Sequence, residues 1–251
     1  LSTDPATGKP YYRDFPELTN RDVVRGHMLL ADHLGISRVK MMIGSSIGGF
    51  QALEWLIMYP DFAKGAALIC TSPKVRPWVI AFNESQRMAI EADGTFGEPR
   101  DDAGAEGMKT ARSIALLSYR GPSAYNATQM ELDKEEKTKG FRAASYQRHQ
   151  GWKLANRFSA YTYYLLTRLV DTHDVGRKRG GVERALGGVK ASCVVIGVTS
   201  DILFPPEENR FMAEHIPGAR FETIESDFGH DGFLVEHEKL NRILRDHLDN
   251  L

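Results

Sequence analysis

A serine stands where a predicted strand turns sharply into a predicted helix. The apolar run Val39–Ile43 is followed by Gly-Ser-Ser-Ile-Gly at positions 44–48 and then by a helical pattern. Small residues suit both sides of such a turn, because the strand and the helix pass close together there. Gly44 and Gly48 flank Ser46 in this way, whereas bulky isoleucines would flank Ser45. We therefore predict that Ser46 is a nucleophile.

A serine hydroxyl needs a base to take its proton and a third group to orient that base. Asp201 follows the predicted strand Ala191–Val198, and His230 lies between glycines after the next predicted strand. The order Ser, Asp, His, with each residue beyond a strand, is typical of the α/β-hydrolase triad. Asp227 and Asp231 are rival acids, but both lie too close in sequence to His230. The sequence thus predicts the triad Ser46–Asp201–His230.

Alternating strands and helices must position these residues. Helices are expected over 19–34, 50–59, 206–215 and 233–248, and strands over 39–43, 63–70, 191–198 and 219–224. This alternation predicts a mostly parallel sheet with helices on both faces. The stretch 76–184 has helical spacing and no convincing strand. The expected organisation is an α/β-hydrolase core over 1–75 and 185–251 with an inserted helical lid over 76–184.

The beginning of the chain is unusual for this fold. The chain opens with Leu1 and a loop rich in proline, glycine and aspartate, and only one predicted strand precedes Ser46. An α/β-hydrolase sheet has several strands before its nucleophile. We therefore expect N-terminal strands to be missing from this chain. Val39–Ile43 would then lie at a sheet edge that is normally interior, or would pair with strands of a segment outside this sequence.

The composition is ordinary for a globular protein. Of the 251 residues, 42% are hydrophobic and 26% charged, and the formal net charge is −1, so nothing favours nucleic-acid binding. Cys70 and Cys193 lie in apolar runs and are predicted to be buried reduced thiols of a cytoplasmic protein. No spacing predicts a metal site. The charged run Met130–Gly140 is expected to be a solvated helix face or loop.

Several segments together resemble the homoserine O-acetyltransferase family of methionine biosynthesis. The similarity covers essentially the whole chain. Its segments are Asp4–Tyr11, Gly44–Gly49 with Gln51–Trp55, Ala81–Arg87, Ser145–Gln147 with His149–Gly151, Ser200–Pro206 and Gly229–Asp231.

The resemblance implies an acyltransferase that moves an acetyl group from acetyl-CoA to the hydroxyl of L-homoserine through a seryl acyl-enzyme. It implies that Arg87 binds the substrate carboxylate, that Asp231 binds its ammonium group, and that the backbone N–H of Ile47 is one oxyanion donor. Acetyl-CoA would be a co-substrate, with no permanently bound cofactor. The resemblance also implies a homodimer formed through the lid.

The sequence is also compatible with other functions. A serine esterase or thioesterase of the same fold would use the same triad with water as acceptor, and a succinyl donor or a serine acceptor fits equally well. Arg87 and Asp231 could instead form ordinary salt bridges. Position 45 is serine where many family members carry glycine, and the second oxyanion donor is not identified. A hydrolase-fold binding protein is the non-enzymatic alternative.

Overall fold

The computed structural model describes residues 2–131 and 137–251. Contacts divide the chain into two compact units. The sheet unit comprises Leu18–Arg76, Tyr119–Pro122 and Thr172–Leu251, and the helical unit comprises Leu1–Glu17, Pro77–Ser118 and Ser123–Asp171. The units differ from the predicted core and lid in two ways. The first 17 residues fall in the helical unit, and residues 76, 119–122 and 172–184 fall in the sheet unit.

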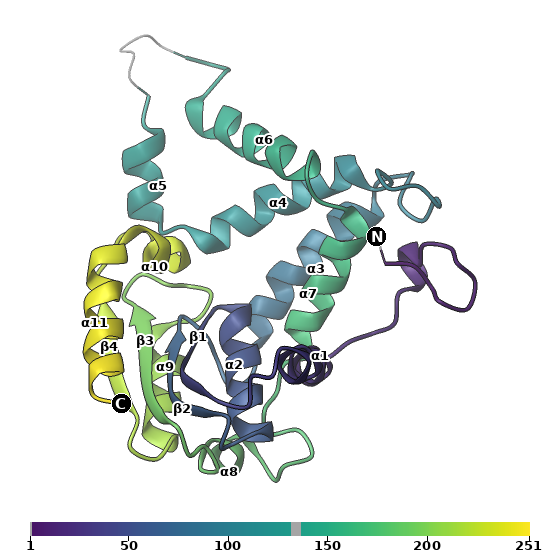
Figure 1. The fold of residues 1–251 in the computed structure, drawn as a ribbon. Helices are drawn as coiled ribbons and strands as arrows, with labels where there is room; N and C mark the ends of the chain where they lie inside the picture. The colour runs from purple at the N-terminus through teal and green to yellow at the C-terminus, as the bar shows by residue number, and fades with distance from the viewer. Residues whose placement is uncertain (1, 132–136) are drawn as a thin grey trace. The chain divides into compact units, whose positions relative to one another are not determined.

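The sheet unit contains a four-stranded parallel sheet in the order β1-β2-β3-β4 (Figure 1). The strands are β1 (Val39–Ser45), β2 (Ala63–Ile69), β3 (Ser192–Val198) and β4 (Arg220–Ile224). All four predicted strands are therefore present, and β1, which leads to Ser46, lies at one edge of the described sheet.

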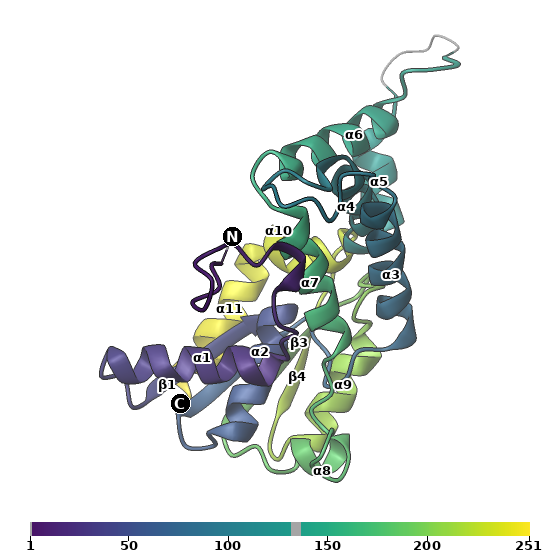
Figure 2. The same ribbon diagram turned by 90° about the vertical axis from the view of Figure 1, so that its right-hand side faces the viewer.

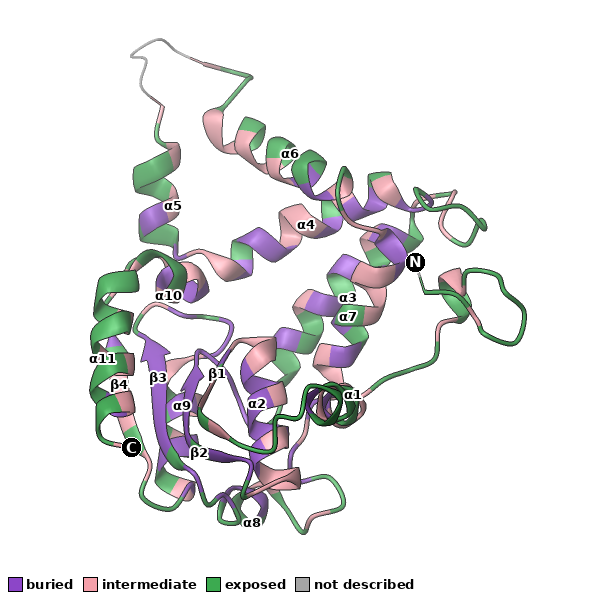
Figure 3. Ribbon diagram, viewed as in Figure 1, coloured by how far each residue is buried: buried purple, intermediate pink, exposed green. Residues whose placement is uncertain are grey.

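Helices cover both faces of this sheet. Apolar residues of α2 (Ile47–Met58), α8 (Val182–Leu186) and α9 (Pro206–His215) form one core cluster with the strands. Leu240, Ile243 and Leu244 of α11 (His237–Asp249) pack with Phe233 of α10 (Gly232–Val235) against the other face. The central strands β2 and β3 are almost wholly buried (Figure 3), as expected for parallel strands covered on both sides.

Two local findings refine the predicted helices. In α1 (Asn20–His33), Asp22 Oδ2 accepts bonds from the N–H and hydroxyl of Thr19, at 2.9 and 2.6 Å, which caps the first turn. The prediction of a single helix over 233–248 is wrong, because the chain forms two helices, α10 and α11, with a break at Glu236. The backbone of Glu236 has ψ of 44°, outside the helical range, although the apolar periodicity continues across it.

After the N-terminal segment, the described part of the helical unit consists of helices and the turns and loops that connect them. Its helices are α3 (Pro77–Glu91), α4 (Ala105–Tyr119, whose last residue falls in the sheet unit), α5 (Pro122–Gln129), α6 (Arg142–Ala155) and α7 (Ala160–Asp171). Figure 2 shows α3 running alongside α7. A short 3-10 helix, η1 (Tyr12–Asp14), precedes them. Of the charged run Met130–Gly140, residues 132–136 lie outside the described residues.

Both cysteines are buried free thiols. In the described ranges, none of the helices combines the length and apolar character that a membrane span requires.

Candidate active site

Ser46 occupies a strained turn between β1 and α2. Its backbone has φ of 52° and ψ of −125°, a left-handed conformation that non-glycine residues rarely adopt. The Ser46 N–H donates to the carbonyl of Ile69 at 2.9 Å, and its own carbonyl accepts from the N–H of Gly49 at 2.9 Å. These bonds hold the turn so that the side chain stands at its apex, while Ser45 remains within the strand.

Neighbouring atoms pack too closely for a side chain at two glycines of this turn, Gly44 and Gly49. A Cβ at Gly44 would lie 2.3 Å from the carbonyl oxygen of Gly48, and one at Gly49 would lie 2.6 Å from the side chain of Thr71. A Cβ at Gly48 would meet open space. The prediction that Gly44 and Gly48 both provide the needed room is therefore correct only for Gly44, because Gly48 contributes its backbone to the contact.

Asp201 and His230 lie in loops that follow β3 and β4. Asp201 is buried, and its Oδ1 accepts hydrogen bonds from the N–H groups of Leu203 at 2.8 Å and Phe204 at 3.0 Å. Its Oδ2 lies 2.7 Å from His230 Nδ1. His230 belongs to the short 3-10 helix η2 (Gly229–Asp231), and its Nε2 lies 2.9 Å from Ser46 Oγ. The three side chains predicted as a triad thus form a continuous hydrogen-bonded series.

The direction of these bonds follows from the chemistry of the carboxylate. An ionised carboxylate only accepts, so Nδ1 of His230 must carry the proton that faces Asp201. The other ring nitrogen, Nε2, then has a free lone pair and accepts the hydroxyl proton of Ser46. This is the tautomer that general-base activation of a serine requires.

Aromatic rings surround His230, and the sequence did not reveal them. Phe204 and Phe233 present edge-to-face contacts with ring centroids 5.4 and 5.6 Å from the imidazole, and the ring of Tyr119 lies at 6.0 Å. Such packing restricts the rotation of the imidazole. No local pattern marks these residues, since they come from three separate segments.

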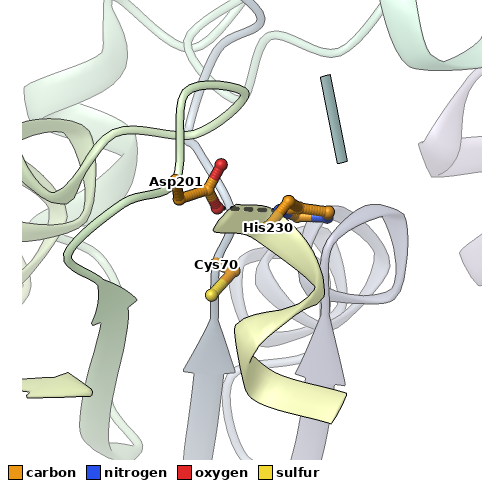
Figure 4. A group of neighbouring side chains, drawn as sticks. All are labelled: Cys70, Asp201 and His230. Carbon is orange, nitrogen blue, oxygen red and sulfur yellow. Dashed lines mark hydrogen bonds and ion pairs between the residues drawn. The ribbon is translucent and has the colours of Figure 1, made fainter. Parts of the chain in front are cut away.

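Cys70 lies beside the Asp201–His230 pair (Figure 4). One potential ligand atom from each of these three residues lies within 4.8 Å of the others, a grouping that spacing along the chain did not predict. Burial, followed by the negative charge of Asp201, raises the pKa of the Cys70 thiol well above its usual value, so this residue stands there as a neutral thiol. Asp201 and His230 already bond to each other, and the absence of a metal requirement stays a prediction.

Asp231, predicted to bind the substrate ammonium, is paired with an arginine that the sequence did not reveal. Arg120 Nε lies 3.3 Å from Asp231 Oδ2. The backbones of the two segments touch directly, because a Cβ at Gly121 would lie 2.2 Å from the carbonyl oxygen of Asp227. Gly229 adopts φ of +63°, and a Cβ there would lie 2.5 Å from the nitrogen of Gly121. The segment 119–122 is therefore packed against the His230 loop.

Arg87, predicted to bind the substrate carboxylate, lies in α3 of the helical unit and is buried. Its guanidinium contacts Glu84 through Nε at 2.8 Å and Nη2 at 2.6 Å, Asp171 through Nη2 at 2.7 Å, and Thr167 through Nη1 at 3.2 Å. Burial lowers the pKa of Arg87, but the bonds to Glu84 and Asp171 outweigh it and raise that pKa overall. Its ligand-binding role stays a prediction.

Ile47, the predicted oxyanion donor, is the first residue of α2. The first N–H groups of a helix have no acceptor within the helix. The N–H of Ile47 is thus available by position to an oxygen bound beside Ser46, and its role in catalysis stays a prediction.

Comparison with known proteins shows the fold and the family of the chain. Residues 3–237 match the family of the alpha/beta hydrolase fold. Homoserine O-acetyltransferase from Cyclobacterium marinum is 45% identical over 245 residues, covering 98% of this chain and 69% of that protein. The enzyme of the same name from Thermus thermophilus is 41% identical, covering 97% of this chain and 62% of that protein.

Solved structures of the same fold carry more than one activity. Homoserine O-acetyltransferase from Bacillus anthracis aligns with a TM-score of 0.89 at 23% identity, covering 98% of this chain and 69% of that one. Esterase E22 aligns with a TM-score of 0.90 at 23% identity, covering 98% and 71%. These likenesses show the fold alone, whereas the sequence relatives show the family. The chain belongs to the homoserine O-acetyltransferase family of the α/β-hydrolase fold.

Proposed function

We propose that this protein transfers an acetyl group from acetyl-CoA to the hydroxyl of L-homoserine, a step of methionine biosynthesis, through an acyl-enzyme on Ser46. The observation that carries the proposal is the series Ser46 Oγ, His230 Nε2, His230 Nδ1, Asp201 Oδ2, with separations of 2.9 and 2.7 Å at its two hydrogen bonds. Homoserine and the acetyl group come from the names of the sequence relatives, and acetyl-CoA as the donor comes from the family resemblance.

In the first half-reaction, His230 Nε2 takes the proton of Ser46 as Oγ attacks the thioester carbonyl of acetyl-CoA. The negative charge on the carbonyl oxygen is stabilised by the N–H of Ile47. The tetrahedral intermediate then collapses, the carbon–sulfur bond breaks, and the imidazolium protonates the departing CoA thiolate. Asp201 stabilises the imidazolium throughout.

In the second half-reaction, His230 takes the proton of the homoserine hydroxyl, and that oxygen attacks the acetyl ester on Ser46. The intermediate collapses to O-acetylhomoserine, and Ser46 recovers its proton from His230. Asp231 and Arg87 bind the ammonium and carboxylate groups of the acceptor in this proposal. Asp231 already pairs with Arg120, and Arg87 already pairs with Glu84 and Asp171. When the acceptor binds, each of these partners is either displaced by it or stays beside it.

The test is a turnover assay with acetyl-CoA in which homoserine, serine and water compete as acceptors. We expect O-acetylhomoserine as the main product and a gain of one acetyl mass on the intact protein when no acceptor is present. Ser46→Ala abolishes both, whereas the adjacent Ser45→Ala retains both. Release of acetate at the same rate with and without homoserine would instead identify an esterase or thioesterase, and faster turnover of succinyl-CoA would reassign the donor.

We further propose that the protein forms a cytoplasmic homodimer through the helical unit. Large apolar side chains are exposed on its helices, with Leu117 of α4 and Trp152 of α6 each 53% exposed. Light scattering at micromolar concentration is expected to give a dimer, and Trp152→Glu to give a monomer. A wild-type monomer with full activity would contradict this proposal.

A further inference from the structure

Two residues that directly follow neighbouring strands both have a positive φ, which is strained for a residue with a side chain. Ser45 of β1 pairs in register with Ile69 of β2, and the next residue on each strand, Ser46 and Cys70, has φ of 52° and 47°. Neither is glycine. Such strain persists only where the surroundings hold it, and it accumulates at functional sites. The strain at Ser46 belongs to the nucleophile turn, whereas the strain at Cys70 has no role in the reaction described above.

The turn at Cys70 is followed by a residue that supports the nucleophile. Thr71 is fully buried, and its hydroxyl donates to the carbonyl oxygen of Ser46 at 2.9 Å. Its side chain also fills the space above Gly49, where a Cβ would lie 2.6 Å from Thr71 Cβ and Oγ1. The backbone of Ser46 is thus held at both ends by the β2 segment, since its N–H bonds to Ile69.

Asn209 of α9 connects this support to the loop that carries Asp201. It is fully buried, and its Oδ1 accepts from the N–H of Thr71 at 3.2 Å. Its amide nitrogen donates to the carbonyls of Phe204 and Pro205, each at 3.1 Å. Phe204 in turn donates its N–H to Asp201 Oδ1 at 3.0 Å. A buried amide with its oxygen and nitrogen both bonded fixes the segments it joins.

We propose that Thr71 and Asn209 are positioning residues of the acyl transfer, which hold the nucleophile turn and the Asp201 loop in one fixed relation. The inference rests on the proposed function, because it assumes that Ser46 is the nucleophile. Without the hydroxyl of Thr71, the Ser46 carbonyl keeps only N–H donors from its own helix, and the left-handed turn relaxes. Ser46 Oγ then leaves its position 2.9 Å from His230 Nε2.

The central comparison is between Thr71→Val and Thr71→Ser in the full chain. Valine keeps the shape and removes the hydroxyl, whereas serine keeps the hydroxyl and removes a methyl group. The readout is the rate at which a fluorophosphonate probe labels Ser46, with kcat and KM for acetyl-CoA measured beside it. We expect Thr71→Val to slow labelling and kcat by about 10- to 100-fold, the scale of a small misplacement of a reacting atom, and to leave KM nearly unchanged. Thr71→Ser is expected to stay close to wild type.

Asn209→Asp provides a second, independent measurement. It keeps the acceptor for Thr71 N–H but replaces both N–H donors with an oxygen that faces two carbonyls. We expect slower labelling, and in the double variant with Thr71→Val a loss smaller than the product of the single losses, because both changes release the same turn. Each variant is assayed below its measured unfolding temperature.

The outcomes separate the two proposals. Labelling of Thr71→Val at the wild-type rate, with only the melting temperature lowered, would overturn the positioning role of Thr71. Multiplicative losses in the double variant would overturn the link through Asn209. A wild-type protein whose Ser46 is neither labelled nor acylated would overturn the proposed function, and with it this inference.

Discussion

The three residues proposed to react and the two proposed to bind the amino-acid acceptor are held in different ways. Ser46, His230 and Asp201 bond to one another, whereas Arg87 bonds to Glu84 and Asp171, and Asp231 bonds to Arg120. The reacting groups therefore have their working geometry before any ligand arrives. The binding groups already have partners of opposite charge, so an acceptor has to exchange with those partners or add to them.

The partners of Arg87 differ in how easily they can be replaced. The side chain of Glu84 is 57% exposed, and that of Asp171 is 16% exposed. The Glu84 carboxylate is therefore the partner that solvent or a ligand can reach, whereas the Asp171 carboxylate is largely enclosed beside Arg87.

The largest effect is expected from Asp201→Asn. Asparagine keeps an oxygen for the N–H groups of Leu203 and Phe204, but its amide nitrogen then faces His230 Nδ1. Nδ1 becomes an acceptor, Nε2 carries the proton, and the ring no longer accepts the proton of Ser46. We expect kcat to fall by about 10⁴-fold in a CoA-release assay.

Asp227→Asn, in the His230 loop, is the matched control and is expected to retain activity. Equal losses in the two variants would mean that Asp201 is not the orienting acid.

A smaller and more selective effect is expected at Arg87. Arg87→Lys keeps the charge but loses the planar fork that binds carboxylates bidentately, so we expect KM for homoserine to rise by about 10- to 100-fold, the scale of a charged hydrogen bond. Hydrolysis of the acyl-enzyme by water is expected to change little. Glu84→Gln removes the competing carboxylate and is expected to lower that KM. If transfer and hydrolysis fall together in Arg87→Lys, Arg87 is only structural.

At Asp231 we expect a loss of about tenfold in kcat/KM for homoserine on substitution by Asn, since one charged contact to the ammonium is lost. Arg120→Gln separates the two roles of the ion pair. If Arg120 competes with the acceptor, this variant lowers KM; if it only holds the His230 loop, kcat falls and KM stays. Unchanged homoserine kinetics in Asp231→Asn would exclude an ammonium-binding role.

The smallest effect on the reaction is expected at a histidine outside the triad, which instead affects the pH dependence of stability. His173 is stacked on Phe50 of α2 at 4.0 Å between centroids, and burial lowers its pKa from 6.5 to about 3. The unfolded chain therefore binds one more proton than the folded protein between these values, so this contribution to stability is present above pH 6.5 and is lost as the pH falls. Urea unfolding is expected to show a loss of about 1 kcal/mol per pH unit below 6.5. A pH dependence that persists unchanged in His173→Gln would assign it to other groups.

The sequence by itself determined the strands, most of the helices and the order Ser, Asp, His of the triad residues along the chain. Alternating apolar runs and helical patterns predicted all four strands, and the helix predicted over 206–215 has the bounds of α9. These features are local, because the periodicity of a strand or a helix depends only on consecutive residues. The elbow glycines and the placement of Asp201 and His230 beyond strands followed from the same local information, since parallel strands bring their carboxyl ends to one edge.

Only the tertiary structure decided which charges and hydroxyls meet. The pairing of Asp231 with Arg120 joins residues 111 positions apart, and the bond from Thr71 to Asn209 joins residues 138 positions apart. Neither pair has a periodic signal. The close approach at Gly49 rather than Gly48, and the break between α10 and α11 at Glu236, likewise depend on the backbone path and on what packs against it. Periodicity specifies which face of an element is buried, whereas the partner of a buried polar atom is fixed only when distant segments pack together.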